Sequence, residues 1–73
     1  RVNKPDTLGD ALPREIARVR DELLPVYDSL PGGAGAIGAM LMRQALDRAS
    51  AAMITGDIVA MTQSHEELKG FEL

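Results

Sequence analysis

Residues 31–38, with the sequence PGGAGAIG, lie in the middle of the chain and decide its fold. Proline cannot continue a helix and glycine readily adopts the backbone conformations that end one, so this stretch predicts a break between two helices. On both sides of it, apolar residues recur at the three- and four-residue intervals that are typical of amphipathic helices. No window alternates apolar and polar residues for long enough to form a strand. The sequence therefore predicts an all-α protein.

Glycine and proline divide the chain into pieces that we expect to pack as a small three-helix bundle. The expected helices span about residues 11–30, 35–55 and 58–69. Residues 1–10 are expected to form a loosely ordered N-terminal arm, in which Thr7 and Asp10 have the spacing of a capping box in its Asp variant. Gly56 is expected to close the second helix as its C-cap, and Asp57 to open the third as its N-cap.

Two further positions predict local features of the helices. Pro25 lies inside the first helix, on its polar side, and is expected to kink it. Gly70 is expected to end the third helix, with Phe71 making the hydrophobic contact of a Schellman-type end.

Each expected helix has an apolar face that we predict to form the core. On the first helix this face consists of Leu12, Ile16, Val19, Leu23, Val26, Tyr27 and Leu30. On the second helix it has a small centre and larger flanks: Gly38, Ala45, Ala49 and Ala52, flanked by Leu41, Met42, Leu46 and Met53. On the third helix it consists of Ile58, Met61, His65 and Leu68. Because small residues let helix axes approach closely, the second helix is expected to be central and to contact both others.

Length and composition predict one small domain that self-associates. The chain has 73 residues and only two aromatic residues, Tyr27 and Phe71, and it has no cysteine for a disulfide. A core of this size supplies only about 3–5 kcal/mol of net stability. We therefore expect a homo-oligomer. The charge balance, with 8 Lys and Arg against 11 Asp and Glu, argues against a nucleic-acid polymer as partner.

Membrane insertion and secretion are not expected. No run of 18 or more apolar residues is present to span a bilayer, and residues 1–5 are not followed by the apolar stretch of a signal peptide. The first residue is Arg1 rather than Met, so we expect that the natural N-terminus differs from it.

Residues 33–38 match the pattern GxGxxG, which in dinucleotide-binding domains follows a strand and opens a helix. Here a helix precedes the pattern, so the preferred interpretation is a turn and cap, with Gly38 also allowing close helix packing. The alternative is a helix N-terminus that receives an anion. Its candidate ligand-binding residues are Gly33 and Gly35, together with Arg20, whose guanidinium would bind phosphate, and Tyr27, whose ring would stack on a base.

Catalytic and metal-binding patterns are not found. His65 and Glu66 begin like the zinc motif HExxH, but Lys69 stands where the second histidine is needed, so neither a metal site nor a cofactor is expected. The interpretation of His65 is a partly buried histidine, with a pH-sensitive contact as the alternative. No serine has the surroundings of a nucleophile, and an enzyme is not expected.

Several residues off the predicted apolar faces indicate an interaction surface. Ile37 and Met40 fall outside the apolar face of the second helix, beside Gln44 and Arg48, and Leu24 lies off the face of the first helix. Apolar residues gathered on one strip next to arginine are typical of protein interfaces. We predict that these five residues belong to an interface.

Three stretches carry a resemblance to a known group of proteins: ALPREIARVR at residues 11–20, GDIVAM at 56–61 and LKGF at 68–71. The chain resembles short accessory proteins of tailed phages and prophages of proteobacteria, over about residues 12–71. The resemblance implies a protein of the bacterial cytoplasm that binds and blocks a host factor, including a defence system. It carries no catalytic residue to this chain.

The leading hypothesis is accordingly a non-enzymatic helical interaction protein that forms a homo-oligomer and binds a host protein. The alternative is an oligomeric sponge that binds a linear or cyclic nucleotide at subunit interfaces. A small enzyme with active sites assembled between subunits is a third and weaker possibility.

Overall fold

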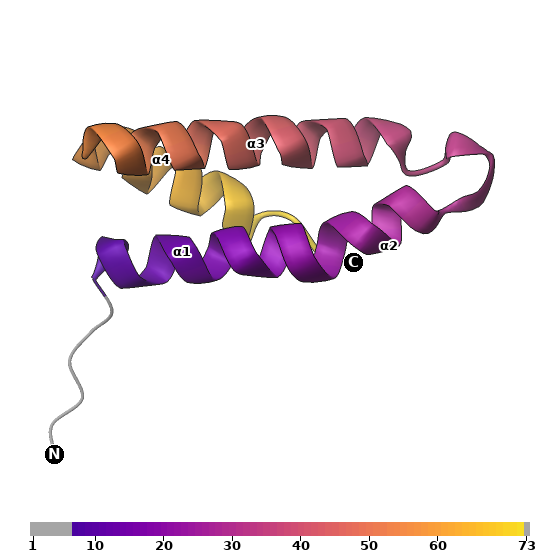
Figure 1. The fold of residues 1–73 in the computed structure, drawn as a ribbon, viewed down its shortest axis with the longest axis horizontal. Helices are drawn as coiled ribbons and strands as arrows, with labels where there is room; N and C mark the ends of the chain where they lie inside the picture. Colours follow the sequence, from indigo (N-terminus) through magenta and orange to yellow (C-terminus); the bar gives the residue numbers. More distant parts are fainter. Residues whose placement is uncertain (1–6, 73) are drawn as a thin grey trace, which may run out of the picture.

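The computed structural model describes residues 7–72, and every regular element in that range is helical. In chain order the elements are α1 (Leu8–Arg18), the π-helical turn η1 (Val19–Leu23), α2 (Leu24–Ser29), the 3-10 turn η2 (Pro31–Gly33), α3 (Ala36–Thr55) and α4 (Ile58–Lys69). Because α1, η1 and α2 follow one another without a break, the chain forms three helices, as expected. Figure 1 shows α3 running alongside this first helix, with α4 packed at the end where α1 begins.

The first helix begins earlier than its apolar pattern predicts. It starts at Leu8 rather than at about residue 11, because Thr7 acts as the N-cap. The hydroxyl of Thr7 accepts a hydrogen bond from the backbone N–H of Asp10 at 3.2 Å and donates one to the Asp10 carboxylate at 2.9 Å. The last three residues of the expected arm are therefore helical, and residues 1–6 lie outside the described part of the chain.

A π-helical turn takes the place of the kink expected at Pro25. In a regular α-helix the ring of Pro25 would clash with the carbonyl four residues earlier. Here Leu24 instead donates its N–H to the carbonyl of Val19, five residues back, which widens the turn just before the proline. The widened turn holds one extra residue and shifts the apolar face by one position. Leu24, expected off that face, thus packs against the core, and Val26 and Leu30, expected on it, are exposed.

The glycine-rich stretch forms the turn between the first helix and α3. Gly32 and Gly33 have φ angles of 67° and 73°, in the left-handed region that favours glycine. Gly35 is the N-cap of α3 and lies against the backbone of Tyr27: a Cβ at this position would be 2.1 Å from the Tyr27 carbonyl oxygen. At Gly38 a Cβ would be 2.7 Å from the Tyr27 ring. The predicted role of Gly38 in close helix packing is confirmed.

The core is built around the small face of α3. Its buried apolar residues are Leu12, Val19, Leu23, Ala39, Met42, Ala45, Ala49, Ala52, Met61 and Leu68. Three residues expected at its margins, Leu41, Met53 and Ile58, are exposed, because α3 and α4 turn only a narrow face toward the other helices. Ala39 and Ser64, which the apolar patterns do not mark, are buried instead.

Both ends of α4 are capped, but in different ways. The carboxylate of Asp57 accepts the Ala60 N–H at 3.1 Å, and Gly56 closes α3 with a φ of 69°, so both predicted caps are confirmed. Gly70 ends α4 in the right-handed region, with a φ of −72°, which contradicts the predicted Schellman-type end. The guanidinium of Arg18 instead donates to the carbonyls of Leu68 and Phe71, at 2.9 and 3.0 Å.

One ion pair lies within the first helix and another connects two helices. Arg18 pairs with Glu15 at 3.1 Å, and both residues lie on α1. Arg43 pairs with Asp28 at 2.6 Å, which connects α3 to α2. Cross-helix partners lie close because the Gly35 and Gly38 contacts bring the helix axes together.

Exchanging Gly35 for alanine should destabilise the fold, because the new Cβ would overlap the Tyr27 carbonyl oxygen. Overpacking of this kind costs about 1–3 kcal/mol of unfolding free energy. Gly9→Ala is the matched control: no atom there is closer than 3.8 Å to the new Cβ, and alanine in an exposed helical turn should stabilise by up to about 1 kcal/mol. Urea unfolding followed by circular dichroism measures both. Equal stability of Gly35→Ala and the wild type would show that the two helices are not in tight contact at Gly35.

Candidate protein-interaction surface

The outward face of α3 carries a continuous strip of exposed residues, which we call the α3 strip. Its members recur at alternating four- and three-residue intervals, with one additional residue beside them: Ile37, Leu41, Gln44, Arg48, Ala51 and Thr55, with Met40. Ile37 is 72% exposed, and Met40 and Leu41 are about half exposed. The regular spacing places all seven on one side of the helix, next to the side that carries the buried alanines.

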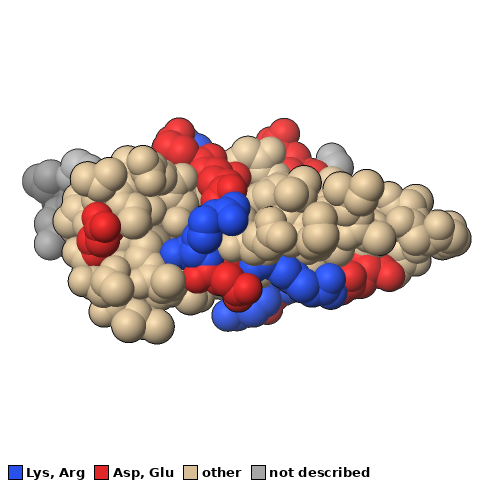
Figure 2. All heavy atoms as spheres, turned by 90° about the horizontal axis from the view of Figure 1, so that it is seen from above, with Lys and Arg blue, Asp and Glu red and all other residues tan. Residues whose placement is uncertain are grey.

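The strip is exposed because α4 is shorter than α3. Figure 1 shows α4 beside only the half of α3 that is nearest to the α3–α4 turn, which leaves the outer side of the other half without a neighbouring helix. In Figure 2, which views the molecule from the α3 side, charged side chains gather in the middle, and the tip toward the α2–α3 turn carries none. The end of α3 nearest to the α2–α3 turn thus presents an apolar surface.

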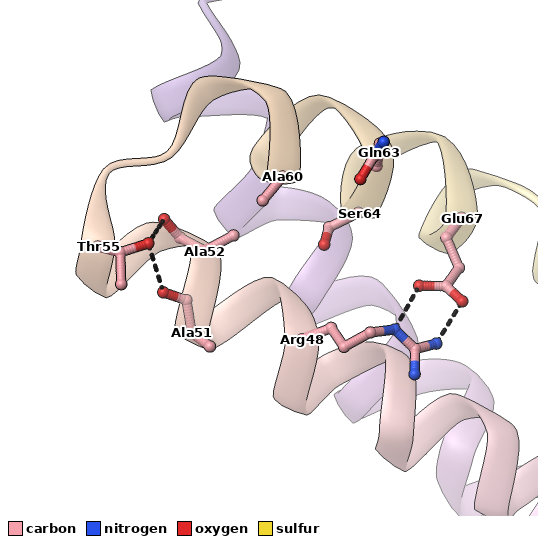
Figure 3. A pocket seen from close by; sticks show the side chains of 8 residues that line it. All are labelled: Arg48, Ala51, Ala52, Thr55, Ala60, Gln63, Ser64 and Glu67. Carbon is pink, nitrogen blue, oxygen red and sulfur yellow. Dashed lines mark hydrogen bonds and ion pairs between the residues drawn. The ribbon is translucent and has the colours of Figure 1, made fainter.

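Beyond Arg48 the strip enters a hollow between α3 and α4, which we call the α3–α4 hollow (Figure 3). Its volume is about 580 Å³. The lining consists of Arg48, Ala51, Ala52, Thr55, Ala60, Gln63, Ser64 and Glu67. Four of these side chains are no larger than a serine, so the two helices leave a space between them. Thr55 uses its own hydroxyl on the carbonyls of Ala51 and Ala52, at 3.1 and 3.2 Å, at the end near the turn.

An ion pair closes the other end of the hollow. The guanidinium of Arg48 faces the carboxylate of Glu67 with two parallel hydrogen bonds, of which the Nε–Oε1 bond is 3.3 Å long (Figure 3). Because both charges are engaged with each other, the hollow and the strip together carry no unpaired charge.

The predicted interface residues divide into two groups. Four of them, Ile37, Met40, Gln44 and Arg48, lie together on the α3 strip. Leu24 is half-buried and packs against the core cluster on the first helix. A second exposed apolar group, which the sequence analysis misses, flanks the α3–α4 turn: Met53, Ile54, Ile58 and Val59. The sequence signal that was available is the pair of consecutive β-branched residues directly after the Gly-Asp turn.

The candidate ligand residues around the glycine turn have other partners. Gly35 is buried against the Tyr27 carbonyl, so the backbone at this position faces protein rather than an open cradle. Tyr27 is half-buried and donates its hydroxyl to the Glu72 carbonyl at 3.0 Å. Gly33 is exposed in the turn. Any side chain at Gly35 would overlap the Tyr27 backbone and disturb the fold, so substituting Gly35 cannot test ligand binding.

Arg20 lines a hollow that does not include the glycine turn. This smaller hollow, of about 340 Å³, is lined by Ile16, Arg20, Arg43, Leu46, Asp47 and Ser50. Arg20 forms a 2.8 Å ion pair with its neighbour Asp21, which lowers the pKa of that carboxyl through the hydrogen bond. Arg43 is paired with Asp28. The structure therefore does not join Arg20 with Gly33 and Gly35 in one hollow.

The remaining polar candidate is His65, whose nearest charged neighbour on α4 is Glu66. His65 is partly buried, and its Nδ1 lies 3.6 Å from a Glu66 oxygen. Within residues 7–72 no three His, Asp or Glu side chains are placed to hold a metal ion. None of the helices in that range has the length and hydropathy to cross a bilayer.

The same substitution at Arg48 and at Arg18 should change the unfolding free energy by different amounts, because Arg48 forms only a surface ion pair and Arg18 also bonds the C-terminal end of α4. Arg48→Met removes an exposed pair and should change the unfolding free energy by less than about 1 kcal/mol. Arg18→Met leaves Glu15 and the carbonyls of Leu68 and Phe71 without a shared donor, and should cost about 1–3 kcal/mol. Thermal unfolding monitored by circular dichroism compares the two. A larger loss for Arg48→Met would contradict the role of Arg18 in holding the end of α4.

Comparison with protein-family models, curated proteins and solved structures finds no match for this chain. The geometry of the α3 strip and the α3–α4 hollow is therefore the basis for a functional proposal.

Proposed function

We propose that this chain is a non-enzymatic helical interaction protein, which forms a homo-oligomer through the α3 strip and acts by stoichiometric binding of a host protein. The observation that carries the proposal is the exposure of Ile37, Met40 and Leu41 along one uncovered side of α3. Single exposed apolar residues are ordinary on protein surfaces. A row of them at helical spacing, beside an arginine that is already paired, has the composition of the centre of an interface.

The modest core supports self-association. Of its ten buried apolar residues, four are alanines, so the chain buries few large side chains for its length. Burial of apolar area contributes roughly 25 cal/mol per Å². Covering Ile37, Met40 and Leu41 in an assembly adds to what the core of one copy supplies, and links folding to oligomerisation.

The biological setting of the proposal follows from the resemblance to phage and prophage accessory proteins. In that setting the chain works in the cytoplasm of a bacterial host and binds and blocks a host protein. Because self-association covers the α3 strip, the exposed apolar group at the α3–α4 turn provides the surface for that partner. No described residue is needed as a catalyst, since the mechanism is occupation of the partner's surface.

The nucleotide-sponge alternative stays a prediction that the geometry does not favour. Its candidate arginine, Arg20, is paired with Asp21, and its Gly35 is packed against Tyr27. A nucleotide held between subunits would have to displace these partners. Calorimetry with linear and cyclic nucleotides at low salt measures this directly.

Light scattering coupled to size exclusion should give a mass above the 7.8 kDa of one chain at micromolar concentration. Met40→Glu should weaken the assembly because it places a charge in a desolvated contact, and the dissociation constant should rise by about tenfold or more. The midpoint of dissociation in a dilution series gives this change.

Thr62→Glu is the matched control for that experiment. Thr62 is exposed on α4 and does not line the α3–α4 hollow, so the same new charge should leave the mass unchanged. A wild-type mass of one chain, or equal weakening by both variants, would contradict self-association through the α3 strip.

A further inference from the structure

The α3 strip has a large end and a small end. Ile37, Met40 and Leu41 provide bulky side chains near the α2–α3 turn, and Ala51 opens into the α3–α4 hollow at the other end. We propose that a second copy of this chain lies antiparallel on the strip, so that Ile37 of each copy fills the hollow of the other. This inference rests on the proposed self-association and specifies its geometry.

The helix geometry places the two ends symmetrically about Gln44. Ile37 and Ala51 are each seven residues from Gln44, which is close to two helical turns and about 10 Å along the axis. A two-fold axis through Gln44 therefore sets Ile37 of one copy opposite Ala51 of the other, and repeats the contact at the far end. The amide of Gln44 has both donors and an acceptor, so it can pair with its own symmetry mate.

Charge selects the antiparallel arrangement over the parallel one. In a parallel pair, Arg48 of one copy would face Arg48 of the other across the contact. In the antiparallel pair centred on Gln44, Arg48 instead faces Met40, and its stem can pack on the thioether while its guanidinium remains on Glu67. Although the chain has a net charge of −3, two α3 strips meet without an unpaired charge.

The hollow suits an aliphatic side chain better than a polar ligand. Ala51, Ala52 and Ala60 supply apolar lining, and the one charged pair, Arg48 with Glu67, is satisfied internally. A ligand that recruited Arg48 would leave Glu67 without its partner. Ile37, 72% exposed in one chain, gains burial without that cost.

Cysteine cross-linking tests the geometry, because the chain contains no native cysteine. Facing helices with axes 8–10 Å apart bring opposed Cα atoms within disulfide range. Gln44→Cys alone and the double variant Ile37→Cys/Ala51→Cys should each convert most of the protein to a covalent dimer under mild oxidation, seen on a non-reducing gel. Positions 37 and 51 lie about 21 Å apart in one helix, so they cannot bridge within a chain.

A single cysteine variant at one end of the α3 strip distinguishes the antiparallel from the parallel arrangement of the two copies. Ile37→Cys alone should stay uncrosslinked in the antiparallel dimer and would cross-link in a parallel one, which would overturn the inference. Thr62→Cys, outside the strip, should also stay uncrosslinked, and circular dichroism checks that every variant is folded.

Failure of the geometry and failure of self-association give different results. A wild-type dimer by light scattering whose Gln44→Cys variant does not cross-link overturns the antiparallel geometry and leaves self-association intact. A mass of one chain with no cross-link at any position overturns both.

Discussion

The contact between the Tyr27 backbone and Gly35 sets how the whole chain packs. No side chain fits between them, since a Cβ on Gly35 would lie 2.1 Å from the Tyr27 carbonyl oxygen. The Tyr27 ring then covers Gly38, one turn further along α3. This fixes the distance between the first helix and α3 at the turn, and the facing residues along α3 have to be small. The buried alanines at positions 45 and 49 meet this requirement.

Because small residues bury little apolar area, they contribute little hydrophobic stabilisation. Hydrogen bonds to the C-terminal segment offset part of this loss. Arg18 holds the end of α4 by donating to the carbonyls of Leu68 and Phe71, where the negative end of the helix dipole also favours a cation. The Tyr27 hydroxyl holds the carbonyl of Glu72. Tyr27 thus makes two stabilising contacts. Its ring and backbone pack against α3, and its hydroxyl donates a hydrogen bond to the C-terminal segment.

The sequence predicts the features that depend on local chemistry. Thr7 and Asp57 act as N-caps because their side chains reach backbone N–H groups three residues ahead, and Gly56 supplies a left-handed C-cap. The small face of α3 follows from periodicity alone. These features need no knowledge of where the other helices lie, and for that reason a single sequence is enough to place them.

Other features depend on long-range geometry and escape a pattern of fixed period. The π-helical turn before Pro25 shifts the apolar face by one residue, so a wheel drawn at 100° per residue places Leu24 outside and Val26 inside. The Leu68 carbonyl that Arg18 contacts and the Asp28 partner of Arg43 lie on other helices, so local spacing does not reveal them. Of the candidate interface, periodicity correctly places Ile37, Met40, Gln44 and Arg48 outside the buried face of α3, but it places Leu41 in the core. Leu24 lies just after the π-helical turn, where that periodicity fails.

The alanines of α3 have opposite consequences on its two sides. Ala45 and Ala49 are fully buried in the core and have no exposed surface. Toward α4, small residues occur on both helices at once, Ala51 and Ala52 facing Ala60 and Ser64, and the space between them stays open. An open apolar space lowers stability, because its lining lacks contact partners. A side chain that enters this space restores those contacts, and the fold holds such a side chain, Ile37, exposed on the same helix at a distance that a two-fold axis through Gln44 converts into contact.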